Sequence, residues 1–287
     1  MNRFYIFLLM ISLILSGCSL QKLALRSTTG IFSYGVDALY DEVDLPLAEQ
    51  AMASNLKLLE GLHKADPSNK EILLLLTQGF ASYSVGFVED ESVPRAKLFY
   101  LRARDYGLLL LRQTKAFKDS IPGREKNFVE RIQQIKRSDI PAVYWTAFAW
   151  GGWIGLSKDD PQAIFDLGKV KAMMQRVIEL DEGFFYGTAH LFFGTIAGSL
   201  PRMLGGDPEQ AKIHFEKCLA LNDKQLLLAY VYLARYYAQP LLDEELFDNY
   251  LKIVLQAPPD ILAENRLLTA IAKDKAQKLI IKKQDLF

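Results

Sequence analysis

Apolar residues recur every three or four positions along most of this chain, as they do on one face of an α-helix. Leu56, Leu59 and Leu62 form one such stripe, whereas the alternating pattern of β-branched residues that is typical of strands is nearly absent. Proline-containing pairs interrupt the stripes at Asp66-Pro67, Asp160-Pro161, Asp207-Pro208 and Ala257-Pro258-Pro259-Asp260. An aspartate before a proline can cap a helix whose first residue is that proline. The pattern therefore predicts an all-α protein built as an array of antiparallel helix hairpins.

One spacing recurs along the chain and is typical of the second helix of a tetratricopeptide repeat. Its clearest copy is Ala211, Phe215 and Cys218, where small and large apolar residues alternate so that paired helices can approach closely. Related copies start at three earlier positions, namely Asn55, Ala96 and Val170. The repeats predict a tetratricopeptide-like superhelix of about ten to twelve helices, which forms a single domain over residues 41–287.

Two of the predicted hairpins share an unusual length. Gly79 and Gly194 each stand 17 residues before the alanine of the second helix, Ala96 and Ala211. A regular tetratricopeptide hairpin is about five residues shorter at this point. The same excess in two places suggests duplication of a modified repeat, and it predicts elaborate connections at residues 88–93 and 200–206.

The first eighteen residues form a separate segment. Residues 4–15 (FYIFLLMISLIL) are apolar and too few to span a membrane, which takes about 20 residues, but they suit a secretory signal. The following Leu15-Ser16-Gly17-Cys18 resembles a bacterial lipobox, in which the cysteine is acylated and becomes the first residue of the mature protein. We predict a lipoprotein signal peptide at 1–17 and a lipidated segment with the first helix at 18–40. An uncleaved anchor that ends at a buried Cys18 remains the alternative.

Lipidation would set the compartment of the protein. Several acyl chains on Cys18 would give a stable anchor, since one chain alone binds a membrane only marginally. The next residue is Ser19 rather than aspartate. By resemblance to lipoproteins of enteric bacteria, this favours the outer over the inner membrane. We therefore expect a lipid-anchored protein on the periplasmic face of the cell envelope.

Composition excludes several classes of protein. The chain has 34 Lys and Arg against 34 Asp and Glu, so it lacks the basic excess that a nucleic-acid-binding domain needs. Half of its residues are hydrophobic, which argues against disorder. Its two cysteines, Cys18 and Cys218, cannot form a disulfide scaffold and need not pair. We expect Cys218 to be buried between helices.

The sequence offers no positive sign of catalysis. His63, His190 and His214 do not have the spacing of metal ligands, and hydrogen-bonded structural roles are expected for the last two. A nucleophile elbow and a phosphate-binding glycine loop are both absent from the sequence. We predict a protein that is not an enzyme and that needs no cofactor or metal.

Aromatic residues supply the most distinctive feature. All three tryptophans fall within nine residues, in the sequence 141–155 (PAVYWTAFAWGGWIG), and a second cluster at 183–187 (GFFYG) follows one repeat later. Glycines in the first segment weaken a helix, which suggests that another helix or a ligand approaches closely. Two interpretations stay open: a packed core, or a groove or channel for an apolar ligand. The candidate ligand-binding residues are Tyr144, Trp145, Phe148, Trp150, Trp153, Phe184, Phe185 and Tyr186, with Arg202 in the extended loop.

Several short strings, in this order, resemble the T component of the TRAP transporters that are associated with tetratricopeptide proteins. They are 102–107 (RARDYG), 144–150 (YWTAFAW), 177–182 (VIELDE), 200–207 (LPRMLGGD), 211–218 (AKIHFEKC), 234–238 (ARYYA) and 285–287 (DLF). The resemblance implies an all-α periplasmic lipoprotein without enzymatic activity. It also implies a hydrophobic channel through each subunit, a homotrimer, and association with the periplasmic substrate-binding subunit of the transporter.

The mechanism implied by this resemblance is to hold a small apolar or amphipathic ligand and pass it to the substrate-binding subunit. A tetratricopeptide-like lipoprotein scaffold for envelope protein assembly is the alternative, because the concave face of a helical array also binds proteins.

Overall fold

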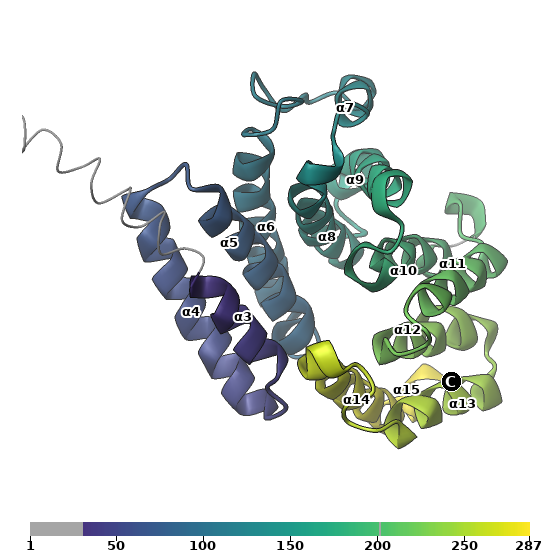
Figure 1. The fold of residues 1–287 in the computed structure, drawn as a ribbon. Coiled ribbons are helices and arrows are strands. Elements are labelled where there is room, and N and C mark those ends of the chain that lie inside the picture. Colours follow the sequence, from purple (N-terminus) through teal and green to yellow (C-terminus); the bar gives the residue numbers. More distant parts are fainter. Residues whose placement is uncertain (1–30, 201) are drawn as a thin grey trace, which may run out of the picture.

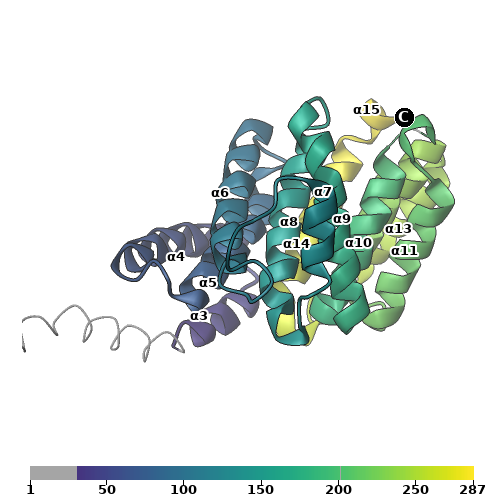
Figure 2. The same ribbon diagram turned by 90° about the horizontal axis from the view of Figure 1, so that it is seen from above.

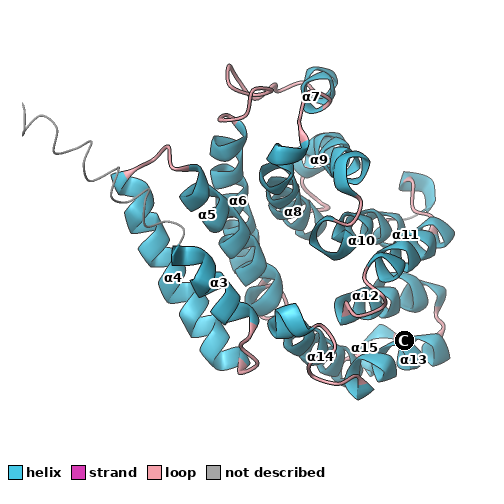
Figure 3. Ribbon diagram, viewed as in Figure 1, coloured by secondary structure: helices cyan, strands magenta, loops and turns pink. Residues whose placement is uncertain are grey.

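The computed structural model describes residues 31–200 and 202–287, and within them it contains helices and turns but no strand (Figure 3). The signal peptide and Cys18 lie outside the described residues. Thirteen α-helices are present in the described part, slightly more than the repeats predict. They are α3 (Ile31–Tyr40), α4 (Leu45–Ala65), α5 (Lys70–Tyr83), α6 (Val93–Leu111), α7 (Glu125–Ile132), α8 (Ile140–Leu156), α9 (Pro161–Asp181), α10 (Phe184–Ser199), α11 (Pro208–Leu221), α12 (Leu227–Leu233), α13 (Glu244–Gln256), α14 (Arg266–Ile281) and α15 (Lys283–Leu286).

The helices pack as consecutive hairpins, which confirms the predicted array. The main pairs are α5 with α6, α8 with α9, α10 with α11, and α12 with α13. Seen from above, α6, α8, α9, α10 and α11 stand side by side along the array (Figure 2). The predicted second helices correspond to α4, α6, α9 and α11, whose small residues Ala96 and Ala211 are fully buried.

The array curves into a ring that α14 closes (Figure 1). Leu267 and Ile271 on α14 form a buried cluster with Ala48 on α4. Beside this cluster, Lys275 lies 2.5 Å from Asp90 and 3.4 Å from Glu89, two residues that follow the C-terminal end of the α5 segment. The C-terminal helices thus contact the N-terminal ones directly.

The five additional residues of the two long hairpins adopt different structures. In the first hairpin, α5 continues into a π-helical turn, η1 (Ser84–Val88), before the chain enters α6. In the second hairpin, the connection contains a single 3₁₀ turn, η3 (Arg202–Leu204). The continuous stretch 70–88 is long and apolar enough to cross a membrane by those two criteria alone. Half of its most apolar window is buried, because α5 packs against α4, α6 and α8 as a core helix of the ring.

Helix α8 is buried on nearly all sides because its sequence is apolar all round. A side-chain atom at Gly152 would come within 2.5 Å of the ring of Tyr100 on α6, and one at Gly151 would come within 3.0 Å of Phe192 on α10. These two glycines therefore allow neighbouring helices to approach. Gly155 differs, because no atom lies within 4 Å of the position where its Cβ would be.

The contrast between these glycines predicts opposite effects on stability. Gly152→Ala should lower the free energy of unfolding by about 1–3 kcal/mol, since Tyr100 is fully buried and cannot move away easily. Gly155→Ala should leave the free energy of unfolding unchanged or raise it by up to about 1 kcal/mol, because alanine favours helix over glycine. Urea denaturation followed by circular dichroism measures both values, and equal effects of the two substitutions would contradict this packing.

Candidate functional site

A cavity of about 1270 Å³ occupies the inside of the ring. Its lining comes from α3, α4, α5, α6, α8, α9, α10, α12 and α14 and from the turns that follow α5 and α12, and it is mainly apolar. Helices α8 and α10 run in the same direction along it, because Tyr144 contacts Thr188 near their first turns and Lys158 contacts Ser199 near their ends. The cavity therefore has two distinct ends along the helix axes: an aromatic end at the start of α8 and a charged end past its last turn.

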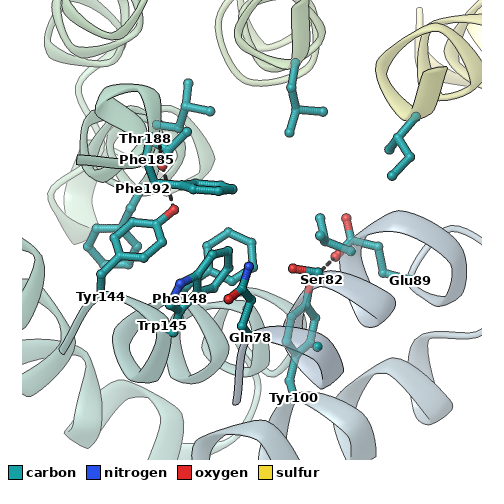
Figure 4. Close-up of a pocket in the computed structure, with 18 of the residues that line it drawn as sticks. Gln78, Ser82, Glu89, Tyr100, Tyr144, Trp145, Phe148, Phe185, Thr188 and Phe192 are labelled. Atoms are coloured by element: carbon teal, nitrogen blue, oxygen red, sulfur yellow. Dashed lines mark hydrogen bonds between the residues drawn. The ribbon is translucent and has the colours of Figure 1, made fainter. Parts of the chain in front are cut away.

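The aromatic end combines residues from the two predicted aromatic clusters (Figure 4). Tyr144, Trp145 and Phe148 on α8 line the cavity together with Phe185 on α10. The ring centroids of Trp145 and Phe185 are 4.7 Å apart in an edge-to-face arrangement, and those of Tyr144 and Trp145 are 5.0 Å apart. Such contacts between rings hold a rigid apolar wall.

A sharp kink at the start of α10 carries Phe185 to this wall. Phe185, Tyr186 and Gly187 all have positive φ angles, of 45°, 62° and 71°. A left-handed conformation costs about 1–3 kcal/mol for a residue other than glycine, and such strain concentrates at functional sites. The kink is a structural reason to regard this part of the cavity as a functional site.

Hydrogen bonds from α11 hold the kink in place. The Tyr186 carbonyl accepts hydrogen bonds from the Cys218 thiol at 3.4 Å and from the Asn222 amide at 3.1 Å. Burial raises the pKa of Cys218 to about 12, so the thiol keeps its proton and donates it. On the other side, Tyr144 donates to Thr188 at 2.5 Å, and Thr188 donates to the Phe185 carbonyl. Cys218 is buried, as the sequence predicts.

The other candidate residues lie outside the cavity lining. Trp150 and Trp153 face the opposite side of α8, where the Arg104 guanidinium lies 5.8 and 5.7 Å from their ring centroids. Phe184 packs against Tyr144 at 5.2 Å between centroids without reaching the cavity. Tyr186 packs toward α11 and α12, and Arg202 is exposed in η3. Four of the nine candidate residues therefore line the cavity, namely Tyr144, Trp145, Phe148 and Phe185.

Several lining residues were not predicted from the sequence. Gln78 and Ser82 on α5 point into the cavity (Figure 4), and Gln78 donates a hydrogen bond of 2.7 Å to the hydroxyl of Tyr40 on α3. Burial raises the pKa of Tyr40 to about 12, so this hydroxyl is neutral. The signal that could have revealed these residues is their spacing of four within an otherwise apolar helix, which places both on one face.

Charged residues gather at the other end of the cavity. Glu89 accepts a hydrogen bond of 2.8 Å from Tyr100, and Asp90 lies between Lys275 and Arg235. Burial alone would raise the pKa of Asp90, but the charge and hydrogen bond of Lys275, together with Arg235, hold it below its ordinary value. Asp90 is therefore ionised at neutral pH.

The histidines do not form a metal site. No group of three His, Cys, Asp or Glu side chains in residues 31–200 and 202–287 is arranged to hold a metal ion. His190 is buried and its Nδ1 lies 2.9 Å from Nδ1 of His214, while its Nε2 lies 3.0 Å from Glu182. Since an ionised carboxylate only accepts, Nε2 of His190 donates to Glu182, and a neutral His190 accepts from His214. These histidines join α10 to α11.

This arrangement makes stability depend on pH. Burial and the proximity of His190 and Lys217 lower the pKa of His214 below its ordinary value of 6.5. The unfolded chain therefore takes up the proton first, and stability is lost as the pH falls from above 6.5 toward the lowered pKa. Between about pH 7.5 and 5.5, the free energy of unfolding should fall more in the wild type than in His214→Gln. Identical pH profiles in urea denaturation would contradict this.

Comparison with known proteins gives two findings. The model of a family described as TRAP transporter T-component matches residues 41–287. An uncharacterized protein of Treponema pallidum (strain Nichols) is 24% identical over 308 residues, an alignment that covers 96% of this chain and 94% of that protein. The family match includes every residue that lines the cavity except those on α3.

Proposed function

The chain belongs to the TRAP transporter T-component family, and from this premise we propose that it holds a small apolar or amphipathic ligand inside its ring. Membership indicates an accessory role in a TRAP transport system. The proposal adds that the ligand passes from the ring to the periplasmic substrate-binding subunit.

The observation that carries this proposal is the cavity itself. Its volume of about 1270 Å³ is above the range of about 300–1000 Å³ that is common for small-molecule sites. Its aromatic wall is rigid and apolar, and its polar side chains are few, as expected of a site that holds a hydrophobic molecule. A core that served only for packing would leave few voids larger than a water molecule.

Attachment and docking complete the proposal. Acylated Cys18 would anchor the protein to the periplasmic face of the envelope, with the outer membrane favoured by Ser19. The substrate-binding subunit would dock at the rim of the cavity. Exposed apolar side chains support this, because Ile164 and Phe165 at the start of α9 are 66% and 54% exposed. The homotrimer implied by the family resemblance would present three such rims.

Native mass spectrometry of protein purified from cells tests the proposal. We expect a noncovalent adduct of a small apolar or amphipathic molecule, which is lost in Trp145→Ala because part of the cavity wall is removed. Empty protein that also takes up no added amphiphile would contradict it. If Trp145→Ala and Phe148→Ala changed binding of a protein partner while no ligand was ever found, the scaffold function would be favoured instead.

A further inference from the structure

Two tyrosine hydroxyls at the charged end of the cavity have no hydrogen-bond partner in the described chain. Tyr232 and Tyr236 line the cavity, and their rings contact each other edge to face at 5.5 Å. Burial raises the pKa of both, so both hydroxyls are neutral donors. Tyr100, which lines the same cavity, donates its hydroxyl proton to Glu89. The hydroxyls of Tyr232 and Tyr236 are not engaged in this way and are available to an acceptor that enters the cavity.

Two cations accompany these hydroxyls. Lys158 lines the cavity and donates to the Ser199 carbonyl at 3.3 Å, and no carboxylate lies within 4.0 Å of its amino group in the described residues. Arg235 lies 5.4 Å from the ring centroid of Tyr236 and 3.8 Å from Asp90, a long contact for an ion pair. Partial burial and the charge of Arg235 lower the pKa of Lys158, so the two cations are close enough to repel each other.

The balance of charge at this end is positive. Glu89 and Asp90 are compensated by Lys275 and Arg235, which leaves the charge of Lys158 unbalanced. An anion between Lys158 and Arg235 would neutralise the excess and relieve their repulsion. It would also accept hydrogen bonds from the two tyrosines, and such charge-assisted bonds are stronger than neutral ones.

The remainder of the cavity is uncharged. Its four charged lining residues all belong to the charged end, namely Glu89, Asp90, Lys158 and Arg235. Tyr144 and Gly155 on α8 both line the cavity and lie eleven positions apart, so the uncharged part extends about 16 Å along the helix. An extended hydrocarbon chain fits such a space beside the aromatic wall.

We infer that the cavity binds an anionic amphiphile in one orientation, with its oxyanion head between Lys158 and Arg235 and its tail along α8 toward Trp145 and Phe185. This inference rests on the proposed function, since it names the class of ligand for the same cavity. The head group is a carboxylate or a phosphate monoester, because both offer the acceptor oxygens that these four side chains require. Tyr232 and Tyr236 recognise the head, and the charge of Lys158 selects against cationic amphiphiles.

Titration calorimetry with four dodecyl compounds, each below its critical micelle concentration, tests the inference. They are dodecanoate, dodecyl phosphate, dodecan-1-ol and dodecylamine, which share one tail and differ only in the head. At least one of the two anions should bind the wild-type protein about tenfold or more tighter than the alcohol and the amine. Tighter binding of dodecyl phosphate would identify a phosphate monoester head, and tighter binding of dodecanoate a carboxylate head.

Substitutions assign the effect to the head site. Lys158→Gln and the double variant Tyr232→Phe/Tyr236→Phe should each weaken binding of the favoured anion by about tenfold and leave binding of dodecan-1-ol unchanged. Tyr→Phe keeps the shape of each ring, and Lys158 is exposed, so the fold should be retained in both variants. Lys171→Gln on the outside of α9 and Tyr250→Phe on α13 are matched controls that should bind all four compounds as the wild type does.

The outcomes separate this inference from the proposed function. Equal binding of the alcohol and both anions, with no change in Lys158→Gln, would overturn the head site and leave the apolar cavity in place. Binding of dodecylamine as tight as that of the anions would also overturn it. Failure of all four compounds to bind would contradict the proposed function itself. Acetate and inorganic phosphate should not bind, and if they bound as tightly as the dodecyl anions the assigned tail site would be wrong.

Discussion

Lys275→Met is expected to lower the free energy of unfolding by about 3–5 kcal/mol, because it removes a buried ammonium that is the closest cation to two largely buried carboxylates. The Lys275 side chain is 6% exposed, and its amino group contacts Asp90 at 2.5 Å and Glu89 at 3.4 Å. These residues lie 185 and 186 positions before it in the chain, so the contact joins the two ends of the ring. Removal of the ammonium should open the ring at this point as well as destabilise it.

Urea denaturation measures the loss of stability, and hydrogen exchange of the α14 amides measures the opening. Lys275→Met/Asp90→Asn should recover part of the loss, since it removes one of the unpaired charges. The matched control is Lys278→Met, one turn further along α14, where Lys278 contacts the exposed Glu91 at 2.7 Å. Exposed ion pairs contribute little, so this variant should remain close to the wild type. Equal losses for Lys275→Met and Lys278→Met would show that burial of the pair is unimportant.

The helical hairpins were predictable because their determinants are local. Apolar spacing, small residues at close helix contacts and helix caps all act within one or two turns. Asp160 and Asp207 cap α9 and α11, as the aspartate-proline pairs predict. Asp66 precedes a proline and Asp260 follows one, but neither caps the start of a helix, because Asn69 and Asn265 are the N-caps of α5 and α14. The dipeptide therefore marks a turn reliably but does not fix which residue starts the helix.

Closure of the ring could not be predicted from the sequence. Lys275 lies in a helix with many charged residues, and its pattern there is that of an ordinary exposed lysine. Its burial depends on the curvature summed over all the hairpins, which brings residues 185 positions apart into contact. Small rotations between successive repeats set this curvature, and no local sequence signal encodes their sum.

The sequence could predict which segment of the chain contributes to the candidate site, but not which face of that helix meets the cavity. The tryptophan cluster correctly marked the central helix, yet α8 is apolar on all sides, so periodicity cannot say which face meets the cavity. The structure assigns Tyr144, Trp145 and Phe148 to the cavity and Trp150 to the packed side. Phe185 reaches the cavity through a left-handed kink that propensity would place at glycine or asparagine rather than at aromatic residues.

Gly155→Trp is expected to weaken binding of the ligand by about tenfold to a hundredfold without loss of the fold. Gly155 lines the cavity near the end of α8, and no atom lies within 4 Å of the position of its Cβ, so the cavity has room for a new side chain at this position. The indole would lie in the space between the head site at Lys158 and the aromatic wall at Trp145. Overpacking of a binding space costs about 1–3 kcal/mol, which corresponds to this change in affinity. Titration calorimetry with the tightest-binding dodecyl compound measures it.

Two matched variants isolate the effect of filling the cavity. Gly155→Ala adds only a methyl group and should bind as the wild type does, whereas Gly61→Trp makes the same change at an exposed position of α4, where no atom lies within 4 Å either. Gly61→Trp should therefore bind normally, and all three variants should unfold near the wild-type temperature. If Gly155→Trp folded normally and still bound the amphiphile with wild-type affinity, the ligand would have to lie elsewhere. The cavity would then be a structural void of the ring, and the site of action would have to lie on exposed apolar surface, such as Ile164 and Phe165 on α9.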